Sequence, residues 1–361
     1  MRKYFIDNLR WMDVLLLIPY HAAQAFNTWG EPYFVFFEPN KAISSLIVFF
    51  SPFFMPLLFL LAGMSTRYAL GKRTYKQYIA ERVKRLLIPF VFGTLAFCPV
   101  LSYTGDITNS GYEGSLASHY KIFFTRWTDL SGFDGGFGVG QFWFLYFLFI
   151  ISLVSIGVIA AVNKISGGRS TGKSVPFPVI CLFVIPLPFL YDLLSIGGKS
   201  FAEYTYVFLI GYFIMADDRV IDKAAEYKFL TMVAGLAASI LNVYMFIWSG
   251  RDFGVLNTAA KAFSEWFMIL ALIGAGKSFL DYNNKVSSYM SQRSFPYFSI
   301  HFLWTVLFQY LLADALRGSL ILLYFVPVIS ALAATFICAE ICIRVPFLCF
   351  LTGTKRRQKA S

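Results

Sequence analysis

The residues that first suggest chemistry are Arg10 and His21, eleven positions apart in the apolar stretch LRWMDVLLLIPYHAAQAF (9–26). On an α-helix this spacing leaves the two side chains about 20° apart around the axis and about 16 Å apart along it. Histidine can act as a general base near neutral pH, and arginine can bind anionic groups. Arg10 could instead anchor the helix at the membrane surface, paired with Asp7 or Asp13. His21 could make only a hydrogen bond between helices.

Glu265 and His301 are further ionisable residues inside apolar stretches. By helical rise, Glu265 lies about 13 Å from the outer end of its predicted span, and His21 about 15 Å from the inner end of its own. In a hydrocarbon core about 30 Å thick these depths are similar. His301 could orient a substrate, polarise a carbonyl group or act as a structural hydrogen-bonding residue. Because ionisable residues in membranes usually face the protein interior, the three predict a polar chamber.

A basic segment, AGMSTRYALGKRTYKQYIAERVKRLLIP (62–89), carries seven Lys and Arg against one acid, Glu81. Arg82 and Arg85 are three positions apart, so on a helix they would point to one side and could hold phosphates together. The same charges could instead lie on anionic lipid headgroups and set the topology.

Membrane helices must position these residues, because the composition is too apolar for a soluble protein. Of 361 residues, 58% are hydrophobic and 14% are charged, against about 25% charged in soluble proteins. The apolar residues form long blocks typical of membrane-spanning helices, which predicts an all-α integral membrane protein. Ten spans are predicted, at residues 11–28, 42–64, 86–104, 141–162, 175–194, 201–215, 229–248, 256–276, 294–313 and 319–343.

The distribution of basic residues predicts the orientation. With the N-terminus in the cytoplasm, 24 of the 31 Lys and Arg fall in cytoplasmic segments, as the positive-inside rule requires. Both termini are therefore expected in the cytoplasm, with a membrane domain at 1–343 and a basic tail at 344–361. The first span lacks a small-residue cleavage site, so we expect a retained helix and not a signal peptide. The net charge of +11 follows from this bias and needs no nucleic-acid partner.

The longest hydrophilic segment, 105–140, contains the glycine-rich stretch SGFDGGFGVG (131–140). No strand is predicted before it and no Lys-Ser/Thr follows it, so a phosphate-binding loop is disfavoured. We expect a flexible lid or a plain connector. Five cysteines lie in or beside apolar spans without the spacing of a metal site, so they are interpreted as small apolar packing residues.

Taken together, these stretches resemble the bacterial acyltransferase-3 family of integral membrane O-acyltransferases, and within it the branch of periplasmic-glucan succinyltransferases. The family's hallmark is an arginine, ten intervening residues and a histidine in the first helix, here Arg10 and His21. The stretches that resemble the family, in order, are YFIDNLRWMDVLLLIPYHAAQAF (4–26), FFMPLLFLLAGMS (53–65), RVKRLLIPF (82–90), FWFLYFL (142–148) and SFPYFSIHF (294–302).

The resemblance implies a ten-helix enzyme of the bacterial plasma membrane. It would move an acetyl, succinyl or similar acyl group from cytoplasmic acyl-CoA to a hydroxyl of an extracytoplasmic glycan or glycolipid. It implies His21 as the catalytic histidine and Arg10, Arg82 and Arg85 as arginines that contact the donor's phosphates. Acyl-CoA is expected as a donor substrate, with no metal and no permanently bound cofactor.

The residues themselves agree with this chemistry. Acyl transfer to a hydroxyl needs a base, and we expect His21 to be that base or a transient acyl carrier, with Glu265 holding its other ring nitrogen. The pantetheine arm of CoA is about 15–20 Å long, comparable with the rise of about 16 Å from Arg10 to His21.

Two alternatives remain open at this stage. One is a proton-coupled secondary transporter in which His21, His301 and Glu265 relay protons, although paired broken helices in two related halves are not evident. The other is the unrelated membrane-bound O-acyltransferase class, which also uses an intramembrane histidine but lacks the arrangement of Arg10 and His21.

Overall fold

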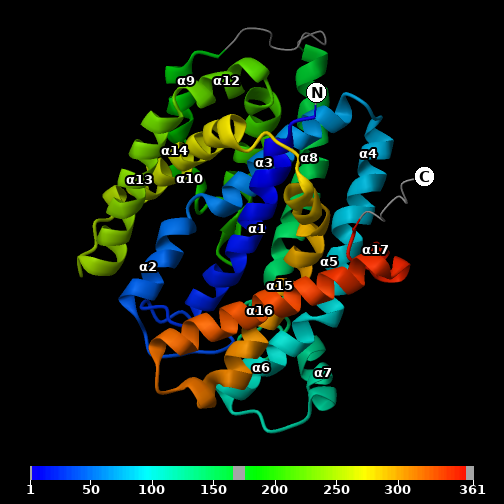
Figure 1. Cartoon of the computed structure of the whole chain (residues 1–361), viewed down its shortest axis with the longest axis vertical. Helices are drawn as coiled ribbons and strands as arrows, with labels where there is room; N and C mark the ends of the chain where they lie inside the picture. The colour runs from blue at the N-terminus through cyan, green and yellow to red at the C-terminus, as the bar shows by residue number, and fades with distance from the viewer. Residues whose placement is uncertain (1, 166–174, 355–361) are drawn as a thin grey trace. The chain divides into compact units, whose positions relative to one another are not determined.

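A computed structural model of the chain describes residues 2–165 and 175–354, and most of these residues are helical (Figure 1). The predicted loop at 163–174 and the predicted basic tail at 344–361 lie partly outside the described residues. The α-helices up to residue 165 are α1 (Tyr4–Gln24), α2 (Lys41–Phe50), α3 (Phe54–Leu70), α4 (Tyr75–Arg82), α5 (Ile88–Ala96), α6 (Cys98–Ser110), α7 (Leu116–Thr125) and α8 (Trp143–Ile165).

The part of the chain after residue 174 is also mainly helical. Its α-helices are α9 (Phe177–Cys181), α10 (Leu187–Leu190), α11 (Phe201–Ile210), α12 (Asp218–Glu226), α13 (Lys228–Val243), α14 (Val255–Phe279), α15 (Lys285–Leu316), α16 (Leu320–Arg344) and α17 (Pro346–Leu351). Turns of π-helix occupy Val83–Leu87, Gly211–Met215 and Tyr244–Trp248, and 3₁₀ turns occupy Gly140–Phe142 and Leu182–Val184. Two short strands, β1 (Ser195–Ile196) and β2 (Lys199–Ser200), pair antiparallel.

Seven helical stretches among the described residues are long and apolar enough to cross a membrane. They are Lys41–Leu70, Tyr75–Ser110, Gly140–Ile165, Lys228–Trp248, Val255–Phe279, Lys285–Leu316 and Leu320–Arg344. Each coincides with one of the ten predicted spans, so the prediction of an α-helical membrane protein is confirmed.

The other three predicted spans do not meet the same criterion. Every 18-residue window of α1 contains Asp7, Arg10 and Asp13, which makes this helix too charged along its length. The predicted spans at 175–194 and 201–215 correspond to the shorter apolar helices Phe177–Leu190 and Phe201–Met215, because prolines interrupt the first and the second is only 15 residues long. Ten crossings therefore stay a prediction.

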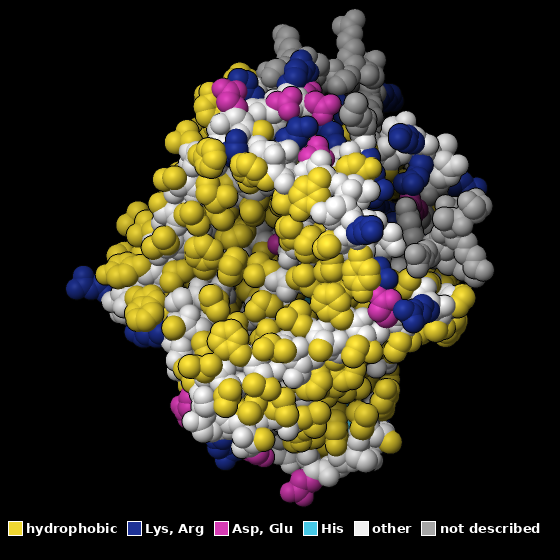
Figure 2. Space-filling model, viewed as in Figure 1, with side chains coloured by type: hydrophobic (Ala, Val, Ile, Leu, Met, Phe, Trp, Pro, Cys, Tyr) yellow, Lys and Arg dark blue, Asp and Glu magenta, His cyan; other side chains and the backbone are white. Residues whose placement is uncertain are grey.

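The surface of the spanning helices is apolar, as lipid contact requires. On α13 the side chains of Phe229, Val233 and Ile240 lie along one helical face, and each is more than 60% exposed. Figure 2 shows hydrophobic side chains dominating the visible face, with few charged side chains among them. Such a surface is typical of helices solvated by hydrocarbon and not by water.

The described chain forms two compact units. Of the described residues, the first comprises 2–10, 48–82, 147–165 and 175–287, and the second comprises 11–47, 83–146 and 288–354. Helix α1 begins in the first unit and ends in the second. In the first unit α13 and α14 pack side by side (Figure 1).

Helices α3 and α11 of the first unit approach each other closely because glycines lie at their crossing. A Cβ atom at Gly63 would lie 2.0 Å from the backbone oxygen of Phe208, and one at Gly211 would lie 2.3 Å from that of Leu60. Small residues at helix crossings allow backbones to pack tightly where lipid supplies no hydrophobic driving force. This contact fixes α3, whose last turn carries Arg67 toward the candidate site.

The second unit is built around the C-terminal half of α1. Its core consists of apolar residues from α1, the segment after it, α2, α6, α15 and α16, namely Ile18, Ala22, Ala23, Ala25, Phe26, Tyr33, Phe34, Val35, Ile47, Leu101, Phe302, Val306, Tyr324, Val328 and Ala331. Alanines on α1 let the aromatic rings of its neighbours pack against the helix. His21 therefore lies on a helix whose C-terminal half is packed into an apolar core.

We expect Gly63→Ala to destabilise the protein, because the added methyl group would overlap backbone atoms of α11. Overpacking of this kind costs about 1–3 kcal/mol, which should lower the apparent melting temperature in detergent. Gly157→Ala is the matched control, since a Cβ atom there meets no atom within 4 Å. Equal melting temperatures for the two variants would contradict the close crossing of α3 and α11.

Candidate functional site

Arg10 is held in the first unit by two polar partners. Its Nη1 atom lies 3.1 Å from Oδ1 of Asp7, and its Nη2 atom donates to Oγ of Ser65 at 3.0 Å. Asp7 lies in the first turn of α1, where a carboxylate interacts favourably with the helix dipole, and its Oδ2 atom accepts a hydrogen bond from Arg2 at 2.7 Å. Of the two acids that the sequence offers as partners for Arg10, the structure pairs it with Asp7.

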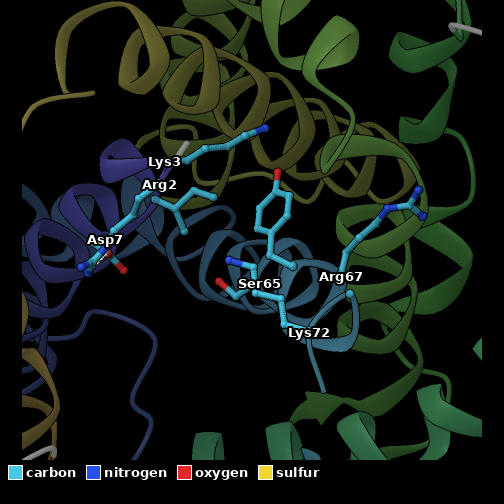
Figure 3. A pocket seen from close by; sticks show the side chains of 9 residues that line it. Arg2, Lys3, Asp7, Ser65, Arg67 and Lys72 are labelled. Carbon is cyan, nitrogen blue, oxygen red and sulfur yellow. Dashed lines mark hydrogen bonds and ion pairs between the residues drawn. The ribbon is translucent and has the colours of Figure 1, made fainter. Parts of the chain in front are cut away.

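A basic pocket of about 750 Å³ opens beside this group. Its lining residues are Arg2, Lys3, Ile6, Asp7, Ser65, Arg67, Tyr68, Gly71 and Lys72. Figure 3 shows Arg2 with Asp7 on one side of the pocket and Arg67 on the other. Four cationic side chains and one carboxylate give the lining a net positive charge. Since both partners of Arg10 line the pocket, Arg10 lies next to its wall.

Lys3 is fixed at the rim of this pocket. Its ammonium group forms an ion pair with Asp218 and lies 5.0 Å from the ring centre of Tyr68. Burial alone would lower the pKa of Lys3, but hydrogen bonds to Asp218 and Tyr68 outweigh burial and raise it. Lys3 therefore stays cationic over the physiological pH range, and the pocket remains suited to an anion.

Arg82 is anchored at the end of α4. Its Nη2 atom donates to Oγ1 of Thr66 at 3.3 Å, and its guanidinium lies 4.6 Å from the ring centre of Tyr78. The hydroxyl groups of Thr66 and Tyr78 are themselves 2.8 Å apart. These contacts join α4 to α3 next to the residues that bind Arg10.

Arg85 does not follow Arg82 on a continuous α-helix. Helix α4 ends at Arg82, and Arg85 lies in the π-helical turn Val83–Leu87, whose residue period differs from that of an α-helix. The structure also assigns Arg82 to the first unit and Arg85 to the second. The two side chains are therefore not brought to one face by α-helical spacing, and joint binding of phosphates by Arg82 and Arg85 stays a prediction.

His21 and His301 lie together in the second unit, with ring centres 5.4 Å apart. His301 is fully buried, and its Nδ1 atom lies 2.8 Å from the backbone oxygen of Phe298. Because a carbonyl oxygen can only accept, Nδ1 must carry a proton, and in the neutral imidazole Nε2 then holds the free lone pair. This Nε2 atom is buried and has no hydrogen-bond partner among the described residues. The structure thus joins two of the three residues from which the sequence predicts a polar chamber.

The last turn of α1, which carries His21, is held by hydrogen bonds to its backbone oxygens. Tyr33 donates to the oxygen of His21 at 3.0 Å, and Nε2 of Gln309 donates to that of Ala22 at 2.9 Å. These carbonyl groups are among the last four of the helix, which have no partner within it. The two side chains therefore fix the direction of the helix end and of the imidazole that it carries.

Sequence reasoning did not identify Tyr33, Gln309 or Ser65 as parts of a site. Gln309 could have been found, because it is a polar residue inside the predicted span at 294–313. Tyr33 and Ser65 carry no such signal, since tyrosine and serine are common at the ends of membrane helices.

Glu265 lies in the first unit, fully buried on α14. Its Oε2 atom accepts a hydrogen bond from Tyr191 at 2.9 Å, and the ammonium of Lys261 lies 3.6 Å from the ring centre of Tyr191. Glu203 is also buried in this unit, as the third residue of α11. The contacts that the structure describes for Glu265 are thus to Tyr191, and its proposed role in holding His21 stays a prediction.

Comparisons with known proteins show which family the chain resembles. An acyltransferase domain family model matches residues 3–343. The chain is 22% identical to glucans biosynthesis protein C of Salmonella paratyphi B, over 98% of this chain and 95% of that protein. The proteins of the same name from Salmonella schwarzengrund and Salmonella agona show the same identity and coverage. No solved structure matches the chain.

The family match covers nearly the whole chain and includes Arg10, His21, Arg82, Arg85, Glu265 and His301. It confirms the resemblance inferred from the five sequence stretches. This multi-pass membrane protein belongs to the acyltransferase-3 family.

Proposed function

We propose that the protein is an O-acyltransferase that moves an acetyl, succinyl or similar acyl group from acyl-CoA to a hydroxyl of a glycan or glycolipid. The observation that carries this proposal concerns helix α1. Its N-terminal end borders a basic pocket, and its C-terminal end carries one of two adjacent histidines. One helix thus joins a site for anions to a site for proton transfer.

The volume and positive charge of the pocket support an acyl-CoA headgroup as its ligand. Ligand pockets generally measure about 300–1,000 Å³, and this one measures about 750 Å³. The phosphates of CoA are bound well by Arg and Lys, which supply charge-assisted hydrogen bonds. With the phosphates at this end of α1, a pantetheine arm of about 15–20 Å would bring the thioester to the level of His21, about 16 Å along the helix.

The histidine pair supplies the base that the reaction needs. His21 would remove the proton of the acceptor hydroxyl while its oxygen attacks the thioester carbonyl carbon. As the carbon–sulfur bond breaks, the proton passes to the thiolate, so the products are an ester and free CoA thiol. The unprotonated Nε2 atom of His301 would accept a hydrogen bond at the same site, from His21 or from the acceptor. General-base catalysis of this kind typically accelerates a reaction by about 10²–10⁴-fold.

The identity of the acceptor rests on the relatives. The proteins at 22% identity are named for glucan biosynthesis, which supports a carbohydrate hydroxyl as the acceptor. In this proposal the chain crosses the bacterial plasma membrane ten times, and both of its termini lie in the cytoplasm. This topology would expose Arg2, Lys3 and the 65–72 segment to the cytoplasm, where acyl-CoA is made.

Donor turnover by the purified protein tests the proposal directly. Free-thiol release would be followed in nanodiscs with acetyl-CoA and succinyl-CoA, with and without crude cell-envelope glycans. Thiol release that requires His21 and rises with glycan would support an acyltransferase and identify its donor. Failure to bind or consume any acyl-CoA, together with a proton-coupled flux that His21→Ala abolishes, would favour the secondary transporter instead.

Removing either histidine is expected to affect the chemical step more than binding. His21→Ala and His301→Ala should each lower kcat by about 10²–10⁴-fold while the KM for acyl-CoA changes little. Gln292→Ala, an exposed position on the same helix as His301, is the control and should keep full activity. A rise in KM with normal kcat would show that the histidines only shape the donor site.

Neutralising the pocket should weaken donor binding. The double variant Arg67→Ala/Lys72→Ala removes two charged hydrogen-bond donors and should raise the KM for acyl-CoA by about tenfold or more. Lys76→Ala/Lys164→Ala removes two exposed charges outside the pocket and should leave the KM nearly unchanged. Equal changes in both double variants would indicate general charge attraction and not a defined phosphate site.

A further inference from the structure

The glycine-rich segment 131–140 is held firmly in the second unit and is not a plain connector. Oγ of Ser102 donates to the backbone oxygen of Gly136 at 2.7 Å. The backbone nitrogen of Phe137 donates to the backbone oxygen of Arg126 at 2.7 Å. The segment is therefore bonded to α6 on one side and to the residue after α7 on the other.

Asp106, at the end of α6, is the centre of these contacts. It is 1% exposed, its Oδ1 atom lies 3.2 Å from Nη1 of Arg126, and its Oδ2 atom accepts from Nε2 of His119 at 3.2 Å. Arg126 also donates to the backbone oxygen of Asp134, inside the glycine-rich segment. A Cβ atom at Gly135, where φ is +83°, would lie 2.3 Å from Cγ of Asp106. Only glycine therefore lets the segment close over this carboxylate.

The segment places Phe133 against the aromatic residues that border His21. The ring of Phe133 lies 4.8 Å from that of Phe34 and 5.7 Å from that of Tyr33. Both of these rings contact Phe302, at 5.7 Å and 6.1 Å between centres. Phe302 in turn lies 4.4 Å from the imidazole of His21. A continuous chain of packed rings thus connects the glycine-rich segment to the histidine pair.

We propose that Asp106 and Arg126 are positioning residues that hold Phe133 as a seal over one end of the His21 and His301 site. This inference rests on the proposed acyltransferase function. The seal would keep bulk water from the thioester, and an acceptor would reach His21 only by fitting beside Phe133 or displacing it. Phe133 would then also limit which acceptor hydroxyls react.

The need for such a seal follows from the chemistry. Water and the acceptor hydroxyl are competing nucleophiles for the same carbonyl carbon. Attack by the acceptor gives an ester and CoA thiol, whereas attack by water gives a free carboxylate, CoA thiol and a proton. A base that activates the acceptor hydroxyl also activates water. Transfer to the acceptor is therefore favoured only if water is excluded from the site.

The test compares the partition between the two reactions in matched variants. Thiol release and acylated glycan would be measured together, and the ratio of hydrolysis to transfer calculated for wild type, Asp106→Asn, Arg126→Gln and Phe133→Ala. Asp192→Asn and Phe124→Ala are the controls, because both are exposed and neither contacts the chain of rings. Amide hydrogen exchange of residues 131–140 would be followed in the same proteins, independently of any activity.

We expect Asp106→Asn and Arg126→Gln to speed amide exchange in 131–140 and to raise the ratio of hydrolysis to transfer several-fold. Phe133→Ala should raise the ratio with little change in exchange, and the controls should match wild type in both. Faster exchange in the first two variants with an unchanged ratio would overturn the inference while leaving the acyltransferase proposal intact. Absence of any thioester turnover by wild type would refute that proposal, and the inference with it.

Discussion

The arrangement of the candidate site depends on one constraint, the need to satisfy the backbone oxygens at the end of α1 within an apolar protein interior. The last four carbonyl groups of a helix lack internal partners, and an unsatisfied group away from water costs several kcal/mol. Tyr33 and Gln309 supply hydrogen bonds to two of these oxygens. The side chains that supply these hydrogen bonds also hold the turn of α1 that carries His21.

In the proposed reaction, helix α1 would also separate two kinds of chemistry that interfere at short range. Binding an anionic donor needs a concentration of positive charge, whereas a base must become positive when it accepts a proton. At an effective dielectric constant of about 20, two positive charges 4 Å apart repel by about 4 kcal/mol, and at 16 Å by about 1 kcal/mol. In the proposed reaction, the eleven-residue spacing between Arg10 and His21 would therefore leave the imidazole able to accept a proton.

The sequence predicts those parts of the structure that depend on local pattern. Seven spans coincide with helices of the structure because long apolar blocks have few alternatives. The motif residue His21 and its neighbour His301 could be assigned to apolar helices from their surroundings alone. The basic pocket could not be predicted, since it joins Arg2 and Lys3 to residues 65–72 through tertiary packing. The π-helical turn Val83–Leu87 and the bond between Glu265 and Tyr191 likewise have no local signal.

The glycine-rich segment shows why local pattern can mislead. Glycines after an irregular stretch indicate freedom of the backbone, and from sequence they favour a flexible lid or a connector. In the structure their role is steric, because a side chain at Gly135 would collide with Asp106. Because Gly135 has no side chain, its backbone can pack closely against Asp106. The buried carboxylate of Asp106 binds both Arg126 and His119. A buried carboxylate is costly unless such partners neutralise it, so the segment and the charges beneath it stabilise each other. The same packing brings Phe133 against the rings next to His21, so the charged groups near the end of α6 are linked to the surroundings of His21.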